Sequence, residues 1–288
     1  MDYTLNIRGQ LMSLAQPLVM GILNATPDSF YANSRMQTAD EVVQRARQII
    51  YEGAAIIDIG ACSTRPGSAF ATQQEETERL RMALSAVRRE LPDAVLSVDT
   101  FRPDVARMAV EEYGVDIIND VGTYGTPHEE EAMYRMVARL NIPYILMSSE
   151  PTLEKTLLFF ANRVQQLRDM GQKDIVLDPG FGFGKTLEQN YELLASLEKL
   201  LVMELPLLVG VSRKSMIYKL LDIQPDEALN GTTALHAVAL MKGASILRVH
   251  DVREAVECVK LLKPLNLLLS PLTPYPLTCF SNLESKTR

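Results

Sequence analysis

Short apolar runs alternate along the chain with longer stretches whose apolar residues recur at helical spacing. The eight runs that suit strands are Leu18–Leu23, Ile56–Ile59, Val95–Val98, Val115–Ile118, Tyr144–Met147, Ile175–Leu177, Leu207–Val209 and Ile246–Val249. The stretches that suit helices are Ala39–Ile50, Gln74–Arg89, Asp104–Glu112, Glu129–Leu140, Leu153–Met170, Leu187–Leu201, Leu229–Lys242 and Arg253–Leu262. Strands that are apolar on both faces and separated by helices predict a parallel sheet that is buried on both sides.

An open doubly wound sheet and a closed barrel are both compatible with this alternation. Eight units of similar length favour closure, and so does the position of the polar residues, which fall just after the predicted strands. We therefore expect a single-domain α/β protein, a (β/α)₈ TIM barrel over residues 18–263. Residues 1–17 are expected to form a short cap segment, and residues 264–288 an irregular tail, because its four prolines disfavour a helix.

Composition narrows the class of protein. With 288 residues, 47% of them hydrophobic and 23% charged, the chain is long and apolar enough for one large core. A net charge of −7 argues against nucleic acid as a partner. No signal pattern or membrane-length apolar run is present, and Cys62, Cys258 and Cys279 lack metal-site spacing. We expect a cytoplasmic protein with reduced thiols and no membrane association.

Polar residues follow the first four predicted strands. Asn24 comes after the first, Ser63–Gly67 after the second, Asp99 after the third and Asn119 after the fourth. Each could be an ordinary turn or helix cap, and for Asn24 alone that is the better interpretation. In a barrel, however, strand ends open into the same space, and this convergence favours a binding site.

The later strand ends carry glycines and cations. Asp178–Thr186 contains three glycines and two phenylalanines, which suit the close approach of a flat ligand. It is not a P-loop, because Pro179 stands where that motif needs its first glycine. Gly210–Ser215 brings basic residues to the seventh strand end. Arg248 and His250 lie two apart on the eighth strand and can face one anion.

Taken together, these segments resemble the dihydropteroate synthases, a family of pterin-binding enzymes. The resemblance extends from about residue 18 to residue 263. The segments that carry it, in the family's order, are Met20–Phe30, Ser63–Gly67, Ser97–Thr100, Ile118–Asp120, Asp178–Thr186, Gly210–Ser215 and Arg248–Asp251.

The resemblance implies a reaction and a set of residue roles. The reaction joins 6-hydroxymethyl-7,8-dihydropterin pyrophosphate to p-aminobenzoate, by a cation-like substitution at the pterin methylene, and releases pyrophosphate. The implied pterin pocket is Asp99, Asn119, Asp178, Lys214 and Phe183, and the implied pyrophosphate site is Asn24, Arg248 and His250, with Mg²⁺ held at Asn24. The implied p-aminobenzoate site is Thr64, Arg65, Pro66, Phe183, Ser212 and Lys214. Asp99, Lys214, Arg248 and His250 would be catalytic; a homodimer and inhibition by sulfonamides are implied as well.

Two positions depart from the family's pattern. Tyr31 and Ala32 stand where the family usually has Ser-Asp, and Ser148 stands where it usually has His. They motivate one alternative, a pterin-binding paralogue without catalytic activity. A second alternative is a pterin-dependent methyltransferase domain, which would not need Ser63–Gly67 or the basic residues after the seventh strand.

Overall fold

The computed structural model describes residues 2–25, 38–62, 71–122 and 130–269 of the chain. Eight parallel strands follow one another around a barrel in the order β8-β7-β6-β5-β4-β3-β10-β9. Their bounds are β3 Leu18–Asn24, β4 Ile56–Gly60, β5 Leu96–Asp99, β6 Ile117–Asp120, β7 Tyr144–Met147, β8 Ile175–Asp178, β9 Leu208–Val209 and β10 Ile246–Val249. A parallel bridge between Leu177 and Leu207 joins the last strands. The predicted (β/α)₈ barrel is confirmed.

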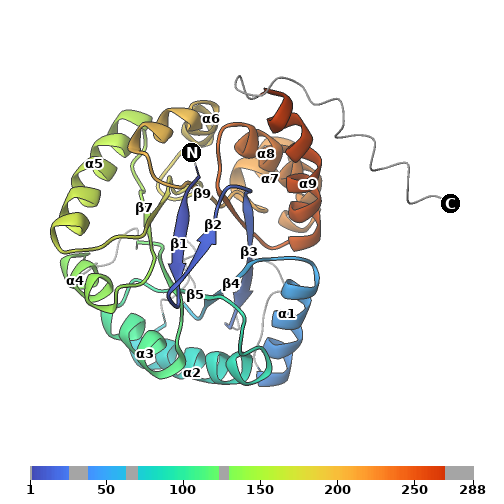
Figure 1. The fold of residues 1–288 in the computed structure, drawn as a ribbon. Helices are drawn as coiled ribbons and strands as arrows, with labels where there is room; N and C mark the ends of the chain where they lie inside the picture. Colours follow the sequence, from blue (N-terminus) through green and yellow to red (C-terminus); the bar gives the residue numbers. More distant parts are fainter. Residues whose placement is uncertain (1, 26–37, 63–70, 123–129, 270–288) are drawn as a thin grey trace.

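The helices form a ring around the strands (Figure 1). They are α1 Ala39–Tyr51, α2 Gln73–Glu90, α3 Pro103–Tyr113, α4 Glu130–Leu140, α5 Leu153–Asp169, α6 Leu187–Ala195, α7 Ser215–Leu221, α8 Leu229–Met241 and α9 Val252–Leu269. Local sequence defines where several begin. Thr38, Thr72 and Thr186 each accept a backbone hydrogen bond at the start of α1, α2 and α6, and a Glu or Gln three residues later completes a capping box.

Side-chain alternation along the strands separates two layers. On β4, Ile57 and Ile59 face outward and pack in the cluster that includes the helices, whereas Ile56 packs in a second cluster inside the barrel. Asp58 lies two residues beyond Ile56 and therefore also faces inward. The same alternation on the other strands gives the barrel an apolar interior near its amino end and polar side chains near its carboxyl end.

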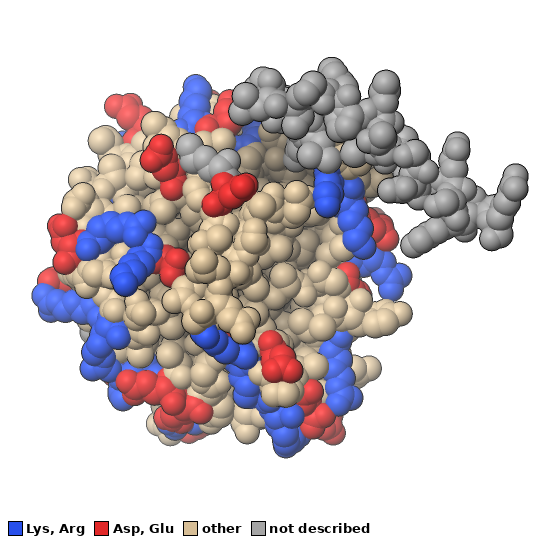
Figure 2. Space-filling view, in the orientation of Figure 1, with Lys and Arg blue, Asp and Glu red and all other residues tan. Residues whose placement is uncertain are grey.

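A β-hairpin covers the amino end of the barrel. It consists of β1, Thr4–Ile7, and β2, Gln10–Ser13, and lies across the strands in Figure 1. Leu5, Ile7 and Leu14 pack against the inward residues at this end. Figure 2 shows the same end, where charged side chains lie mostly around the edge. Apolar side chains fill this end of the barrel. A polar binding site inside the barrel is therefore expected at the carboxyl end.

Three elements differ from the sequence-based expectations. The predicted helix Leu187–Leu201 is two elements, since α6 ends at Ala195 and a 3₁₀ helix follows over Leu197–Met203. Helix α7 was not predicted. The expectation that the tail is non-helical from Pro264 is wrong as far as Leu269, because α9 continues through the proline. Pro264 is exposed there, so its ring lies toward solvent and the helix loses only one backbone donor.

Candidate active site

An arginine and two carboxylates form the centre of a polar cluster at the carboxyl end of the barrel. Arg248, on β10, donates from Nε to Asp58 Oδ2 at 2.6 Å and from Nη2 to Asp99 Oδ2 at 2.7 Å. The side chain of Arg248 is 15% exposed and that of Asp99 16%, so these charge-assisted bonds lie largely out of water. Gly60 pairs with Asp99 across β4 and β5, and its missing side chain leaves room beside that carboxylate.

Asp58 was not among the residues predicted for the site. It lies within the run Ile56–Ile59, which the sequence analysis treated as uniformly apolar. The signal that could have found it is the alternation itself, because a carboxylate at an inward position of a buried strand needs a partner. Its partner is Arg248.

Asn119 extends the cluster across the barrel. From β6 it donates Nδ2 to Asp58 Oδ2 at 3.1 Å, and its side chain is fully buried. Among the described residues, neither Asn119 Oδ1 nor Asp58 Oδ1 has a hydrogen-bond partner, although both atoms are buried. Because buried polar atoms are normally paired, these oxygens indicate a place where a ligand with donor groups can bind.

The glycine-rich segment after β8 places Asp178 and a lysine. Asp178 Oδ1 accepts from the backbone N–H of Gly180 at 2.8 Å. Gly180 has φ +67°, and a Cβ there would lie 2.1 Å from the carbonyl oxygen of Ser148, so only glycine fits. Lys185 Nζ donates to the carbonyl oxygens of Gly180 (3.0 Å) and Ser148 (3.2 Å), which ties this segment to the end of β7.

Lys214 lies on the opposite side of the same segment. Its Nζ donates to the carbonyl oxygen of Phe181 at 2.5 Å and lies 4.7 Å from the centre of the Phe183 ring, a cation–π contact. Burial lowers the pKa of Lys214 to about 8, and the charge of Asp178 opposes that shift. Lys214 and Phe183 therefore form one wall of the barrel mouth next to Asp178.

Burial shifts the pKa values of two titratable groups at the barrel mouth, Asp99 and His250. Burial raises the pKa of Asp99 to about 7, against the opposing effect of Arg248. Burial and the charge of Arg248 lower the pKa of His250 to about 3, so this imidazole is neutral under physiological conditions. Asp99 is thus close to its titration point, whereas His250 is a neutral hydrogen-bonding group.

The loop after β10 is held from two sides. The backbone N–H of His250 donates to Ser212 Oγ at 3.2 Å, and Arg45 Nη2, from α1, donates to the carbonyl oxygen of His250 at 2.6 Å. His250 and Ser212 are therefore neighbours at the seventh and eighth strand ends, where barrels often bind phosphate groups.

Asn24 provides an oxygen close to this anion-binding side. A side-chain carbon built at Gly60 would lie 3.6 Å from Asn24 Oδ1 and 3.7 Å from Asp99 Oδ2, so both oxygens border the same small space. An amide oxygen is a ligand type that Mg²⁺ accepts, although Mg²⁺ usually keeps several ligands from water and substrate phosphates. The described residues contain no group of three or more His, Cys, Asp or Glu side chains that could hold a metal without such help.

Arg213 does not join the site, although the basic run after β9 suggested it. Its Nε and Nη2 donate to the two oxygens of Asp251 at 2.8 and 2.9 Å, and its Nη1 donates to the carbonyl oxygen of Pro225 at 3.1 Å. The residue has a left-handed backbone conformation, φ +53°. Arg213 therefore links the seventh and eighth loops rather than contacting a ligand.

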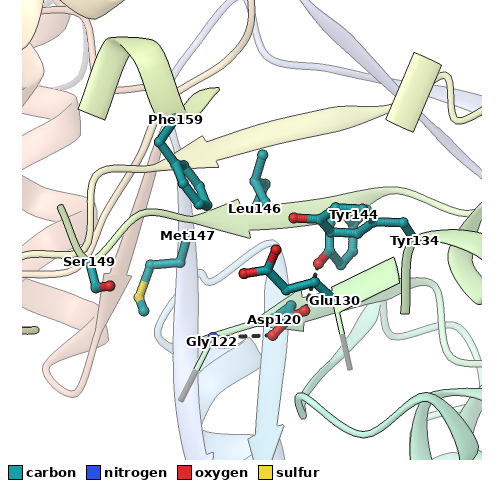
Figure 3. A pocket seen from close by; sticks show the side chains of 9 residues that line it. All are labelled: Asp120, Gly122, Glu130, Tyr134, Tyr144, Leu146, Met147, Ser149 and Phe159. Carbon is teal, nitrogen blue, oxygen red and sulfur yellow. Dashed lines mark hydrogen bonds between the residues drawn. The ribbon is translucent and has the colours of Figure 1, made fainter. Parts of the chain in front are cut away.

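Asp120 also points away from the cluster, unlike its neighbour Asn119. It accepts from Tyr144 OH at 2.6 Å and from the N–H of Gly122 at 3.1 Å. Figure 3 shows it at a cavity of about 90 Å³ between the ends of β6 and β7 and helices α4 and α5. The residues lining this cavity are Asp120, Gly122, Glu130, Tyr134, Tyr144, Leu146, Met147, Ser149 and Phe159. Among the described residues, none of those predicted for the site lines it, so the inward cluster is the stronger candidate.

The structure places most of the predicted residues at one mouth. Those that lie there are Asn24, Asp99, Asn119, Asp178, Phe183, Ser212, Lys214, Arg248 and His250. Thr64, Arg65 and Pro66 lie outside the described residues. None of the helices in the described ranges is both long and apolar enough to span a bilayer.

Comparison with known sequences gives a consistent family. The model of a family described as pterin binding enzyme matches residues 20–250. A dihydropteroate synthase of Escherichia coli (strain K12) is 38% identical over 271 residues, which cover 89% of this chain and 94% of that protein. A dihydropteroate synthase of Clostridium beijerinckii is 36% identical over 252 residues, covering 84% and 92%.

Solved structures agree with the sequence comparison. The Yersinia pestis dihydropteroate synthase in a sulfonamide drug complex superposes with a TM-score of 0.84 at 37% identity, over 92% of this chain and 100% of that one. The Xanthomonas albilineans dihydropteroate synthase with 4-aminobenzoic acid gives a TM-score of 0.83 at 33% identity, over 95% and 100%. Both similarities extend over nearly the whole chain.

Proposed function

The chain belongs to the dihydropteroate synthases of the pterin-binding enzyme family, and from this premise we propose how its barrel mouth carries out their reaction. That reaction is the condensation of 6-hydroxymethyl-7,8-dihydropterin pyrophosphate with p-aminobenzoate, giving 7,8-dihydropteroate and pyrophosphate. The observation that carries the residue assignment is the cluster in which Arg248 donates to Asp58 and Asp99 and Asn119 donates to Asp58, with Asp178 and Lys214 alongside.

Asp99, Asn119 and Asp178 bind the amino-pyrimidinone edge of the pterin. This edge presents an amino group and ring N–H groups, which need acceptors. Carboxylate oxygens and the buried, unpartnered Oδ1 of Asn119 supply them. Phe183 and Lys214 close the face of the same pocket, because the Lys214 ammonium lies against the Phe183 ring.

Arg248 and His250 bind the pyrophosphate. Arg248 has a forked guanidinium that suits phosphate oxygens, and neutral His250 contributes a hydrogen bond without a second buried charge. Asn24 is the residue that would hold Mg²⁺ on this side, and its amide oxygen is a suitable ligand type. When bound, Mg²⁺ supplies positive charge that stabilises the departing pyrophosphate.

The reaction breaks the bond between the pterin methylene carbon and the pyrophosphate oxygen, and forms a bond from that carbon to the aniline nitrogen. Arg248 and His250 stabilise negative charge on the departing oxygens. Asp99 and Asp178 favour positive charge on the pterin as that bond breaks. The aniline nitrogen then attacks and its proton is lost to solvent, so no strong base is needed.

The residues that we propose to bind p-aminobenzoate are Ser212, Phe183 and Lys214, together with Thr64, Arg65 and Pro66.

A turnover assay tests this proposal. We expect the purified protein to release pyrophosphate and form dihydropteroate when both substrates and Mg²⁺ are present, and to lose most of this activity when Mg²⁺ is chelated. Tight pterin binding without any turnover would contradict the proposal and favour the paralogue without catalytic activity. Turnover that survives complete chelation would contradict the metal assignment alone.

We also propose that the enzyme is a homodimer. Large apolar side chains are exposed on three neighbouring helices, α7, α8 and α9 (Figure 1). They include Leu220 and Leu221 (55% and 52% exposed), Met241 (59%) and Leu261 (74%). When such side chains together form one contiguous patch, the patch marks a site of contact with another protein. The mass in solution by light scattering tests this, with Met241→Glu expected to shift the protein to monomer and a wild-type monomer contradicting it.

A further inference from the structure

The buried carboxylate Asp58 joins two residues that the proposed function places on different substrate groups. Its side chain is fully buried on β4. Oxygen Oδ2 accepts from Arg248 Nε at 2.6 Å and from Asn119 Nδ2 at 3.1 Å. Asp58 therefore contacts both the arginine assigned to pyrophosphate and the asparagine assigned to pterin.

We propose that Asp58 is a positioning residue that fixes the orientation of the Asn119 side-chain amide, so that the carbonyl oxygen of Asn119 faces the pterin site. This inference rests on the proposed function, because it assumes that a pterin is what Asn119 contacts. It adds a residue to that function and explains why the pocket accepts hydrogen bonds instead of donating them.

The chemistry of the two side chains determines the orientation. An ionised carboxylate has only acceptors, whereas an amide has a donor end and an acceptor end that have nearly the same shape. Arg248 can only donate, so Asp58 Oδ2 is the acceptor in their bond. The amide of Asn119 must therefore turn its NH₂ group toward Asp58, and its oxygen toward the opposite side.

The oxygen of Asn119 is the atom that a ligand would meet. It is buried, and within the described part of the chain it has no hydrogen-bond partner. A ligand edge with N–H groups satisfies it, whereas an edge of acceptors would leave two buried acceptors face to face. Asp58 thus selects for a flat heterocycle that presents an amino group and ring N–H groups.

Exchanging the two residue types tests this arrangement. In Asp58→Leu, residue 58 loses the oxygen that accepts from both Arg248 and Asn119, so Asn119 can reverse its amide and turn a donor toward the ligand. In Asn119→Asp, two carboxylates about 3.1 Å apart repel each other. The double variant, Asp58→Asn with Asn119→Asp, removes this repulsion: the new amide turns its oxygen to Arg248 and its NH₂ group to the new carboxylate, which again presents an oxygen to the ligand, with the same total charge.

The measurement is the dissociation constant of 6-hydroxymethylpterin without its pyrophosphate, by titration calorimetry. We expect each single variant to bind about tenfold to a hundredfold more weakly, equivalent to about 1.4–2.8 kcal/mol, and the double variant to return to within about threefold of wild type. A merely structural role for Asp58 would not produce this rescue, since the double variant would be at least as impaired as the worse single variant.

Asp116→Leu is the matched control. Asp116 is also a buried aspartate that accepts from an arginine Nε at 2.6 Å, but it lies at the hairpin end of the barrel, beside Arg8. We expect it to lower thermal stability and leave pterin affinity unchanged.

Each outcome decides between the two proposals. Unchanged pterin affinity in Asp58→Leu, or absence of rescue, overturns the positioning role while leaving the proposed function intact. If Asp58→Leu does not fold, the affinity of the double variant decides alone, by the same threefold limit. A wild-type protein that does not bind the pterin overturns the proposed function, and the inference with it.

Discussion

Replacing Arg248 with alanine removes the cation from between two carboxylates. Asp58 is fully buried and Asp99 has 16% of its side chain exposed, so neither carboxylate can be solvated by water when the guanidinium is gone. Removing one partner of a buried ion pair typically costs about 3–5 kcal/mol, because the remaining charge stays buried. We expect a loss of this size at pH 8, which lowers the melting temperature by roughly 6–20 °C.

The size of this loss depends on pH. Burial raises the pKa of Asp99 to about 7 and Arg248 opposes that rise, so the alanine variant has a still higher Asp99 pKa. An acid whose folded pKa lies above its unfolded value is destabilising when ionised. That effect is absent below the unfolded pKa and complete above the folded one. The difference between variant and wild type should therefore shrink from pH 8 to pH 5.5 by up to about 1.4 kcal/mol, because pH 8 lies about one unit above the wild-type Asp99 pKa.

Urea unfolding at the two pH values measures this difference, with equal denaturant slopes as the condition for comparing free energies. Arg248→Lys is the matched variant. It keeps the positive charge, so its deficit should be smaller and nearly the same at both pH values. A deficit in Arg248→Ala that is equal at pH 8 and pH 5.5, or below about 1 kcal/mol at pH 8, would refute the argument that Arg248 neutralises buried carboxylates.

Three further results are expected. Asp99→Ala should lower turnover by at least about a hundredfold, because a buried acceptor for the pterin is lost; initial rates equal to those of wild type would mean that the pocket is elsewhere. Since Asp99 offers both oxygens as acceptors and a negative charge only when ionised, and its pKa is about 7, kcat/KM for the pterin pyrophosphate should fall as the pH drops below about 7; a flat profile from pH 5.5 to 8 would be inconsistent with this role. Sulfonamides resemble p-aminobenzoate and should compete with it in steady-state kinetics, whereas purely noncompetitive inhibition would argue against the assigned site.

The sequence alone predicted the barrel because its signal is repeated. Eight buried strands in regular alternation with amphipathic helices leave few arrangements that cover both sheet faces. Asp99, Asn119 and Asp178 were predicted because each ends a strand, and strand ends of a barrel open into one mouth. The closure between β8 and β9 depends on a single bridge, from Leu177 to Leu207, which no local pattern indicates.

The sequence misled for Asp58 and Arg213, because the direction of their side chains depends on the backbone around them and not on residue type. Asp58 was missed because it lies inside a strand and not at its end, where polar residues were expected. Arg213 was grouped with Lys214 because the two are adjacent in the chain. Arg213 has a left-handed backbone conformation, φ +53°, and its side chain bonds Asp251; an arginine does not indicate such a conformation.

A crystal structure of the protein with the dihydropterin pyrophosphate and Mg²⁺ tests the central assignment most directly. We predict that the amino and ring N–H groups of the pterin lie about 3 Å from Asn119 Oδ1 and the Asp178 carboxylate, with the pyrophosphate at Arg248 and His250. A pterin bound instead beside Asp120 and Tyr144, or with acceptor atoms toward Asn119, would contradict the account.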